Sequence, residues 1–125
     1  LTDLAEQSDF LVVCCPGGPE TRHIVDSTVL NALGKKGFLV NVARSSIVDT
    51  EALITALKER AIAGAAIDVY DNEPNIPDAF KELDNVVLTP HLSGSADDAT
   101  HAKYLLYMEN MRAHFDGMAL PTPAP

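Results

Sequence analysis

The hydrophobic residues of the first part of the chain gather in four short runs: FLVVCC at 10–15, FLVNVA at 38–43, GAAIDVY at 64–70 and NVVLT at 85–89. Within each run the apolar residues are nearly continuous and do not alternate with polar ones. This pattern is typical of parallel β-strands that are covered on both faces. We therefore predict four parallel strands.

Helical segments are predicted between these strands. A cap at Asp26 or Ser27 starts one helix, and a cap at Asp49 or Thr50 starts a second helix over 51–60. Apolar residues recur at helical spacing in both segments: Val29, Leu30, Leu33, Leu53, Ile54 and Leu57. Repetition of strand, helix and strand implies right-handed crossovers, and it predicts an α/β fold with a parallel sheet.

The pattern changes near residue 95, where Ser95, Asp97 and Asp98 resemble a capped, dipole-matched helix start. Beyond them, apolar residues recur every three or four positions: Ala102, Leu105, Met108, Met111 and Phe115. One long amphipathic helix is predicted to run to about 114–117, and its stripe is interpreted as core or subunit contact. The tail LPTPAP is proline-rich and is expected to be extended.

Composition narrows the class of protein. The chain has 125 residues, of which 46% are hydrophobic and 22% charged, as in a soluble globular domain. No run approaches the roughly 18 apolar residues of a membrane span. A net charge of −9 argues against binding to nucleic acid or to anionic membranes. The first residue is Leu1, which leads us to expect a cut, processed or engineered piece.

The cysteines are the neighbours Cys14 and Cys15, within the first apolar run. Adjacent side chains on a strand point to opposite faces, which disfavours a disulfide between them. We expect buried, reduced thiols in a reducing cytoplasm. The pair also lacks the intervening residues of the usual metal motifs, so no metal site is predicted.

Side chains that could take part in a reaction follow three of the predicted strands. Arg44, Glu73 and His91 each come just after a strand, and the carboxyl ends of parallel strands share one edge of a sheet. Arginine can hold a carboxylate by two hydrogen bonds, and histidine backed by a carboxylate can move a proton. These parts suit chemistry on a small 2-oxo or 2-hydroxy acid. Each residue can also be interpreted as an ordinary surface or loop residue without a catalytic role. Asp71 is a second acid close to Glu73 in sequence.

Three segments occur in the order NVARSSIVDTEALITAL, AIAGAAIDVYDNEP and NVVLTPHLSG. Together they resemble signatures of the D-isomer-specific 2-hydroxyacid dehydrogenase family, and CCPGGPETRHIVD resembles the segment that precedes them there. The chain is similar to the C-terminal portion of such an enzyme, particularly of the glyoxylate/hydroxypyruvate reductase branch. The resemblance implies the second half of a Rossmann-like sheet. A partial NAD(P)-binding domain would span 1–94, with a C-terminal helix and tail at 95–125.

The resemblance also implies roles for individual residues. Arg44 would bind the substrate carboxylate and keto oxygen, and His91 would be the general acid/base with Glu73 as its partner. Asp68 would lie near the nicotinamide amide. The cofactor-binding residues implied in this way are Cys15, Pro16, Val42, Ala43, Arg44, Asp68 and His91. The other histidines, His23, His101 and His114, are expected to be solvated or structural.

The chain departs from the family pattern in several places. Ser45 stands where a glycine is usual, and Gly17-Gly18 replaces bulkier residues near the nicotinamide. The family's G-x-G-x-x-G turn does not occur, so the coenzyme is left as NAD or NADP. We expect reduction of glyoxylate or hydroxypyruvate by a homo-oligomeric enzyme, with little turnover by the isolated 125 residues. The alternative is a non-enzymatic remnant or interaction module that kept the fold.

Overall fold

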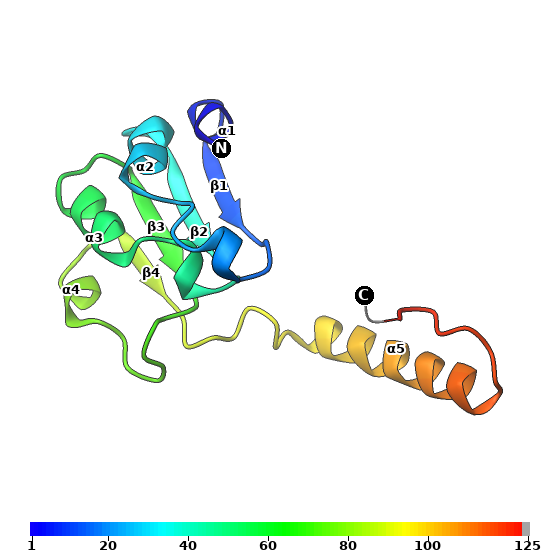
Figure 1. Cartoon of the computed structure of the whole chain (residues 1–125). Helices are drawn as coiled ribbons and strands as arrows, with labels where there is room; N and C mark the ends of the chain where they lie inside the picture. Colours follow the sequence, from blue (N-terminus) through cyan, green and yellow to red (C-terminus); the bar gives the residue numbers. More distant parts are fainter. Residues whose placement is uncertain (124–125) are drawn as a thin grey trace. The chain divides into compact units, whose positions relative to one another are not determined.

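A computed structural model describes residues 1–123 of the chain (Figure 1). The chain divides into two compact units, Leu1–His91 and Leu92–Pro125. The first unit holds a sheet, its covering helices and the three loops that carry the candidate residues. Over residues 92–123 the second unit holds one long helix, and it is described by itself below.

A four-stranded parallel sheet forms the centre of the first unit, with the strand order β1-β2-β3-β4. The strands are β1 (Phe10–Val13), β2 (Phe38–Asn41), β3 (Gly64–Ile67) and β4 (Val86–Leu88). All four arrows in Figure 1 point the same way. The predicted α/β fold is confirmed. Each strand is shorter than its apolar run, because the last residues of the run leave the ladder to form the loops at the carboxyl edge.

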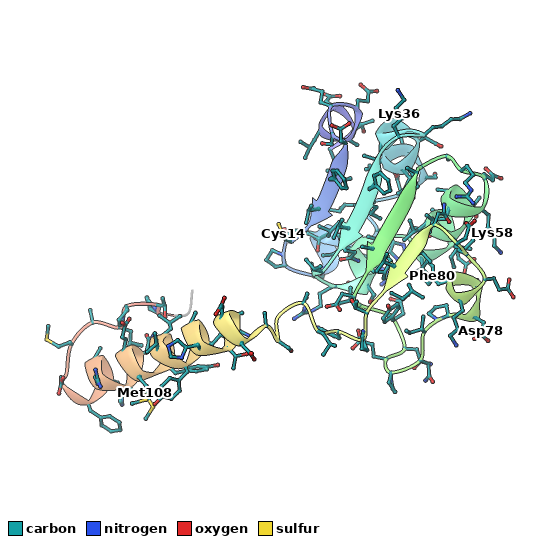
Figure 2. The ribbon with its side chains drawn as sticks, turned by 180° about the vertical axis from the view of Figure 1, so that it is seen from behind. Cys14, Lys36, Lys58, Asp78, Phe80 and Met108 are labelled. Atoms are coloured by element: carbon teal, nitrogen blue, oxygen red, sulfur yellow. The ribbon has the colours of Figure 1, made fainter. Side chains whose placement is uncertain are left out.

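Helices connect the strands and cover one face of the sheet. They are α1 (Thr2–Glu6), α2 (Ser27–Leu33), α3 (Thr50–Lys58) and α4 (Asp78–Lys81), with short 3-10 turns at Pro19–Thr21 and Ser45–Ile47. In Figure 2, seen from behind, the strands lie in front of α2 and α3. The core between these layers includes every residue of the two predicted helical stripes: Val29, Leu30, Leu33, Leu53, Ile54 and Leu57.

The predicted starts of α2 and α3 are confirmed by their caps. An Asp26 carboxylate oxygen accepts a hydrogen bond from the Val29 N–H, and an Asp49 oxygen accepts one from the Ala52 N–H, both at 3.0 Å. Each bond satisfies one of the amide groups that a first helical turn leaves without a partner. The second helix begins at Thr50 and ends at Lys58, slightly earlier than predicted at both ends.

The opposite face of the sheet is bare, contrary to the prediction of cover on both faces. Phe10 and Val87 are 63% and 64% exposed, and the Phe10 and Phe38 rings stack with centroids 5.2 Å apart. The reason is topological: the strands follow one another across the sheet in sequence order. Right-handed crossovers that all advance in the same direction place the connecting helices α2, α3 and α4 on the same face.

The cysteines differ from the prediction in burial but not in pairing. Cys14 is exposed and Cys15 is half-buried, and both are free thiols. Burial was expected from a strand running to residue 15, but β1 ends at Val13 and the two cysteines begin the following loop. Figure 2 shows Cys14 at the end of β1.

The second unit contains the predicted long helix, α5 (Asp97–Phe115). Its N-cap is Ala96 without a side-chain cap bond, so the predicted cap at Ser95 is wrong. The expected single apolar stripe is wrong as well, whereas the expected core or subunit contact of this helix stays a prediction. Every described residue of α5 is half-buried or exposed, and the apolar run at 104–107 occupies all sides of the helix. Within residues 1–123, no helix has the length and apolar character needed to cross a membrane.

Candidate active site

The loops that follow β2, β3 and β4 carry Arg44, Glu73 and His91 respectively. Because these strands are parallel and adjacent in the sheet, their carboxyl ends lie along one edge, which we call the carboxyl edge. Parallel sheets bind their ligands outside this edge, where loops from separate strands can meet. The loops that carry the three candidate residues therefore start next to one another at the carboxyl edge.

Glu73 and His91 form a hydrogen-bonded pair. The His91 Nδ1 atom lies 2.9 Å from Glu73 Oε2, and Glu73 Oε1 accepts a hydrogen bond of 3.0 Å from the Tyr70 N–H. The hydrogen bond from His91, reinforced by the one from Tyr70, holds the pKa of the Glu73 carboxyl below its ordinary value. The side chains of His91 and Glu73 are 47% and 38% exposed, so the pair can be reached by a ligand.

The neighbouring acid in the same loop has a different partner. The Thr50 hydroxyl donates a hydrogen bond of 3.1 Å to the Asp71 carboxylate, which ties the loop to the start of α3. Glu73, and not Asp71, is therefore the acid that meets the imidazole. Because Nδ1 of His91 faces this carboxylate, the other ring nitrogen, Nε2, is left to face a ligand.

The backbone of His91 adopts the left-handed conformation, with a φ of 55°. This region is uncommon for residues with a Cβ atom, and such residues are found where the surrounding structure fixes them, often at functional sites. The conformation turns the chain sharply at the end of β4 and helps to place the imidazole beside Glu73.

Arg44 extends from a turn that a buried asparagine holds in shape. The side chain of Asn41 donates to the Arg44 carbonyl and accepts from the Ala43 N–H, both at 3.1 Å. The Arg44 Nη1 atom donates to the Ala43 carbonyl at 2.6 Å. Gly17, in the loop after β1, leaves space for the arginine stem, because a Cβ atom there would lie 2.8 Å from Arg44 Cγ.

The structure brings two of the three predicted catalytic residues into contact. Within residues 1–123, the hydrogen bond of the Arg44 guanidinium goes to Ala43 and not to Glu73 or His91. The backbone of Arg44 is fixed, while its side chain is exposed. Convergence of all three groups on one ligand stays a prediction.

The residues predicted to face the nicotinamide also lie at the carboxyl edge. Cys15 and Pro16 follow β1, whereas Val42 and Ala43 follow its sheet neighbour β2. Cys15 and Ala43 are half-buried, and Pro16 and Val42 are exposed. These small, mostly apolar groups are compatible with a flat heterocycle, so this part of the edge fits the nicotinamide end of a dinucleotide.

Asp68 occupies a different environment from these edge residues. It is 2% exposed and accepts a hydrogen bond from the Thr89 hydroxyl. This contact links the ends of β3 and β4, and any contact of Asp68 with a cofactor stays a prediction. Among the residues that the structure describes, no three His, Cys, Asp or Glu side chains gather as a metal site would require.

Three polar residues at this edge were missed by the sequence reasoning: Asn41, Tyr70 and Thr89. Asn41 shapes the Arg44 turn, and Tyr70 and Thr89 bond to the segments that carry Glu73 and His91. A signal was present in two cases. Asn41 is the polar residue in FLVNVA, and Tyr70 places a hydroxyl at the end of the mostly apolar run GAAIDVY. A buried polar group of this kind requires a partner.

Comparison with known proteins identifies the family of this domain. Residues 1–93 match the family model described as D-isomer specific 2-hydroxyacid dehydrogenase, NAD binding domain. A glyoxylate/hydroxypyruvate reductase A of Arabidopsis thaliana is 46% identical over 98% of this chain and 39% of the relative. A 2-ketogluconate reductase of Gluconobacter oxydans is 43% identical over 98% of this chain and 40% of the relative.

Solved structures give the same result. The NADPH-dependent glyoxylate/hydroxypyruvate reductase of Sinorhizobium meliloti, in complex with NADP and malonate, aligns with a TM-score of 0.85 at 42% identity. The alignment covers 98% of this chain and 39% of that one. The chain thus spans about two-fifths of the length of these relatives. It belongs to the family of D-isomer specific 2-hydroxyacid dehydrogenases, whose NAD binding domain it matches.

Proposed function

We propose that this chain supplies the proton-transfer and carboxylate-binding residues of an NAD(P)H-dependent enzyme that reduces a small 2-oxo acid to a 2-hydroxy acid. The observation that carries the proposal is the 2.9 Å contact between His91 and Glu73 at the carboxyl edge of a domain of this family. Glyoxylate and hydroxypyruvate are the first candidate substrates, because several relatives are named for them.

Reduction of a ketone adds a hydride to carbon and a proton to oxygen. A reduced nicotinamide supplies the hydride when it is bound. His91 donates the proton from Nε2 to the ketone oxygen, and the Glu73 carboxylate orients the ring through Nδ1. The guanidinium of Arg44 binds the substrate carboxylate through two parallel hydrogen bonds, for which its planar fork is suited.

The nicotinamide end of the coenzyme would rest on the residues that follow β1 and β2, namely Cys15, Pro16, Val42 and Ala43. Asp68 is retained as a proposed cofactor contact. Either NAD or NADP fits this part of the site, and the NADP bound by the Sinorhizobium relative favours NADP. The sequence has no G-x-G-x-x-G turn for the pyrophosphate, so we assign that contact to the part of the family architecture that lies outside this chain.

The proposal is tested by assaying the complete protein that contains this chain. NADH and NADPH are each combined with glyoxylate and with hydroxypyruvate, and the 125-residue chain is assayed in parallel. We expect reduction by the complete protein and little or none by the chain alone. A complete protein that binds NADPH but reduces neither acid would contradict the proposal and favour an interaction module.

Three further properties are proposed for the whole protein. A homo-oligomer is supported by the apolar surface of α5, and a cytoplasmic location is supported by the two free thiols. The negative charge of the chain opposes binding to nucleic acid or anionic membranes. We retain 1–94 as the cofactor-domain portion and 95–125 as the helix and tail. Light scattering on the complete protein tests the oligomer, and a monomeric mass would contradict it.

A further inference from the structure

Tyr70 lies at the point where β3 gives way to the Glu73 loop, and its ring is buried in the core. Its two polar groups bond in different directions. The backbone N–H donates to Glu73 Oε1 at 3.0 Å. The phenol oxygen lies 2.8 Å from the Ile67 carbonyl and 3.0 Å from the Thr89 carbonyl, so its single proton is held between the ends of β3 and β4. One residue therefore contacts both segments that carry the proton-transfer pair.

Thr89 is the residue through which this contact reaches the histidine. Its N–H donates to the Ile67 carbonyl at 3.0 Å, its hydroxyl donates to Asp68, and its carbonyl accepts from Tyr70. All three polar groups of Thr89 are thus tied to β3 or to the residues just beyond it. His91 follows after Pro90, whose ring limits the rotation of the short connection.

Side-chain packing alone leaves room for movement beside the pair. A cavity of about 110 Å³ lies next to Glu73 and His91, lined also by Tyr70, Pro74, Ile76 and Pro90. About 10–15 Å³ of such space is enough to hold one water molecule, so this cavity leaves room for a shift of either side chain. Hydrogen bonds are then needed to fix the separation of the imidazole and the carboxylate.

We propose that Tyr70 is a positioning residue for proton transfer: it joins the Glu73 loop to the end of β4, so that the His91 imidazole is held against Glu73. The catalytic meaning of this inference rests on the proposed function. The hydrogen bonds of Tyr70 that carry it are independent of that function. A phenylalanine would fill the same space in the core, but it would remove the hydroxyl that the Thr89 carbonyl accepts from. If Tyr70 acts through packing alone, the contact between Glu73 and His91 should therefore be unchanged in Tyr70→Phe.

The ionisation of Tyr70 agrees with this arrangement. Burial raises the pKa of its phenol above the ordinary value of 10.0, a hydrogen bond with the Thr89 backbone offsets part of this rise, and the nearby carboxylates of Asp68 and Glu73 add to it. The hydroxyl thus keeps its proton over the neutral pH range and remains a donor.

The test is a carbon-13 NMR titration of the Glu73 carboxyl in the 125-residue chain, comparing wild type with Tyr70→Phe. Tyr104→Phe, which removes an exposed hydroxyl on α5, is the matched control. We expect the pKa of Glu73 to rise toward 4.5 in Tyr70→Phe, because the Thr89 carbonyl loses its donor and the imidazole is held less firmly against the carboxylate, and to stay unchanged in Tyr104→Phe. An unmoved Glu73 pKa in a folded Tyr70→Phe variant would overturn the proposal.

Two further readouts make the outcome decisive. If Tyr70→Phe does not fold, hydrogen exchange is measured on the wild-type chain instead. The Tyr70 hydroxyl proton should exchange slowly with water, and fast exchange would overturn the proposal. In the complete protein, Tyr70→Phe should lower kcat about tenfold with KM for the 2-oxo acid unchanged, since a positioned acid contributes at least about a hundredfold. A raised Glu73 pKa in a protein that reduces no 2-oxo acid would leave the positioning role standing and count against the proposed function alone.

Discussion

The two ends of the carboxyl edge are built differently. At the β3–β4 end, Glu73 and His91 touch each other, and Tyr70 bonds to the segments on which both are carried. At the β1–β2 end, Asn41 fixes the backbone around Arg44, but the guanidinium itself is exposed. Proton transfer requires donor and acceptor atoms within about 3 Å, whereas a carboxylate ligand can complete the geometry of a flexible cation as it binds. Hydrogen bonds thus hold the side chains of the proposed proton-transfer pair against each other, whereas at the Arg44 end they hold the backbone.

The largest effect should come from the β3–β4 end. His91→Gln in the complete protein removes the proposed general acid while keeping a polar side chain, and kcat should fall by about 10² to 10⁴. Steady-state reduction of glyoxylate with NADPH provides the measurement. His101→Gln, an exposed histidine on α5, serves as the control and should leave kcat unchanged. Retention of wild-type kcat in His91→Gln would remove His91 from the mechanism.

At the β1–β2 end, Arg44→Lys should lower kcat/KM for 2-oxo acids by about an order of magnitude or more. Lysine keeps the charge but loses the planar pair of donors. The matched control is Arg60→Lys, because Arg60 forms a surface ion pair with Asp84 at 2.6 Å. Equal kinetics of wild type and Arg44→Lys would show that no paired hydrogen bond is made to the substrate.

A smaller effect is expected at Gly17, which gives the stem of Arg44 its space. In Gly17→Ala the new methyl group would lie 2.8 Å from Arg44 Cγ, so either the arginine stem or the loop backbone must shift. We expect KM for the 2-oxo acid to rise about three- to fivefold with little change in kcat. Gly18→Ala is the control, since an added Cβ there has nothing within 4 Å. If both alanine variants behave alike, the contact with Arg44 does not matter.

The smallest effect concerns pH. The hydrogen bond from His91 lowers the pKa of Glu73 from 4.5, so the carboxylate form is favoured in the folded chain. The stabilisation that this gives is present above pH 4.5 and is lost as the pH falls through the lowered folded value. The NMR titration of wild type should therefore place the Glu73 carboxyl below 4.5. A value at or above 4.5 would mean that the pair does not form in solution.

Asp78 provides an internal control for that titration. Its pKa is lowered by the hydrogen bond and charge of Lys81, at a distance of 2.7 Å. In Lys81→Met the pKa of Asp78 should rise while that of Glu73 stays where it was. A parallel shift of both carboxyls would indicate a general change in the fold and not the loss of one contact.

Local features of the fold could be predicted from the sequence. The caps at Asp26 and Asp49 and the buried stripes of α2 and α3 depend on residues within a few positions of one another, so pattern and chemistry agree. Among the site residues, spacing alone did not separate Glu73 from Asp71. The family motif selected Glu73, and the structure gives the physical difference: Asp71 is bonded to Thr50, far away in sequence.

Features that depend on distant parts of the chain were harder to predict. The sequence pattern around an apolar residue such as Phe10 is the same whether its face of the sheet is covered or bare. Only the order of the strands shows that the connecting helices lie on the other face. The spacing of Leu105 and Met108 suggested a stripe on α5, but the neighbouring Tyr104 and Tyr107 extend the apolar surface around the helix. The role of Tyr70 depends on Thr89, which lies on another strand end.

The most direct test of the central claim is a crystal structure of the complete protein with NADP and malonate, the two molecules held by the Sinorhizobium relative. One malonate carboxylate stands in for that of the substrate, and an oxygen of the other stands in for the keto oxygen. We predict that the first carboxylate binds the Arg44 guanidinium and that the second oxygen lies within about 3 Å of His91 Nε2, with Nδ1 still bonded to Glu73. Malonate bound away from both residues, or His91 turned away from Glu73, would contradict it.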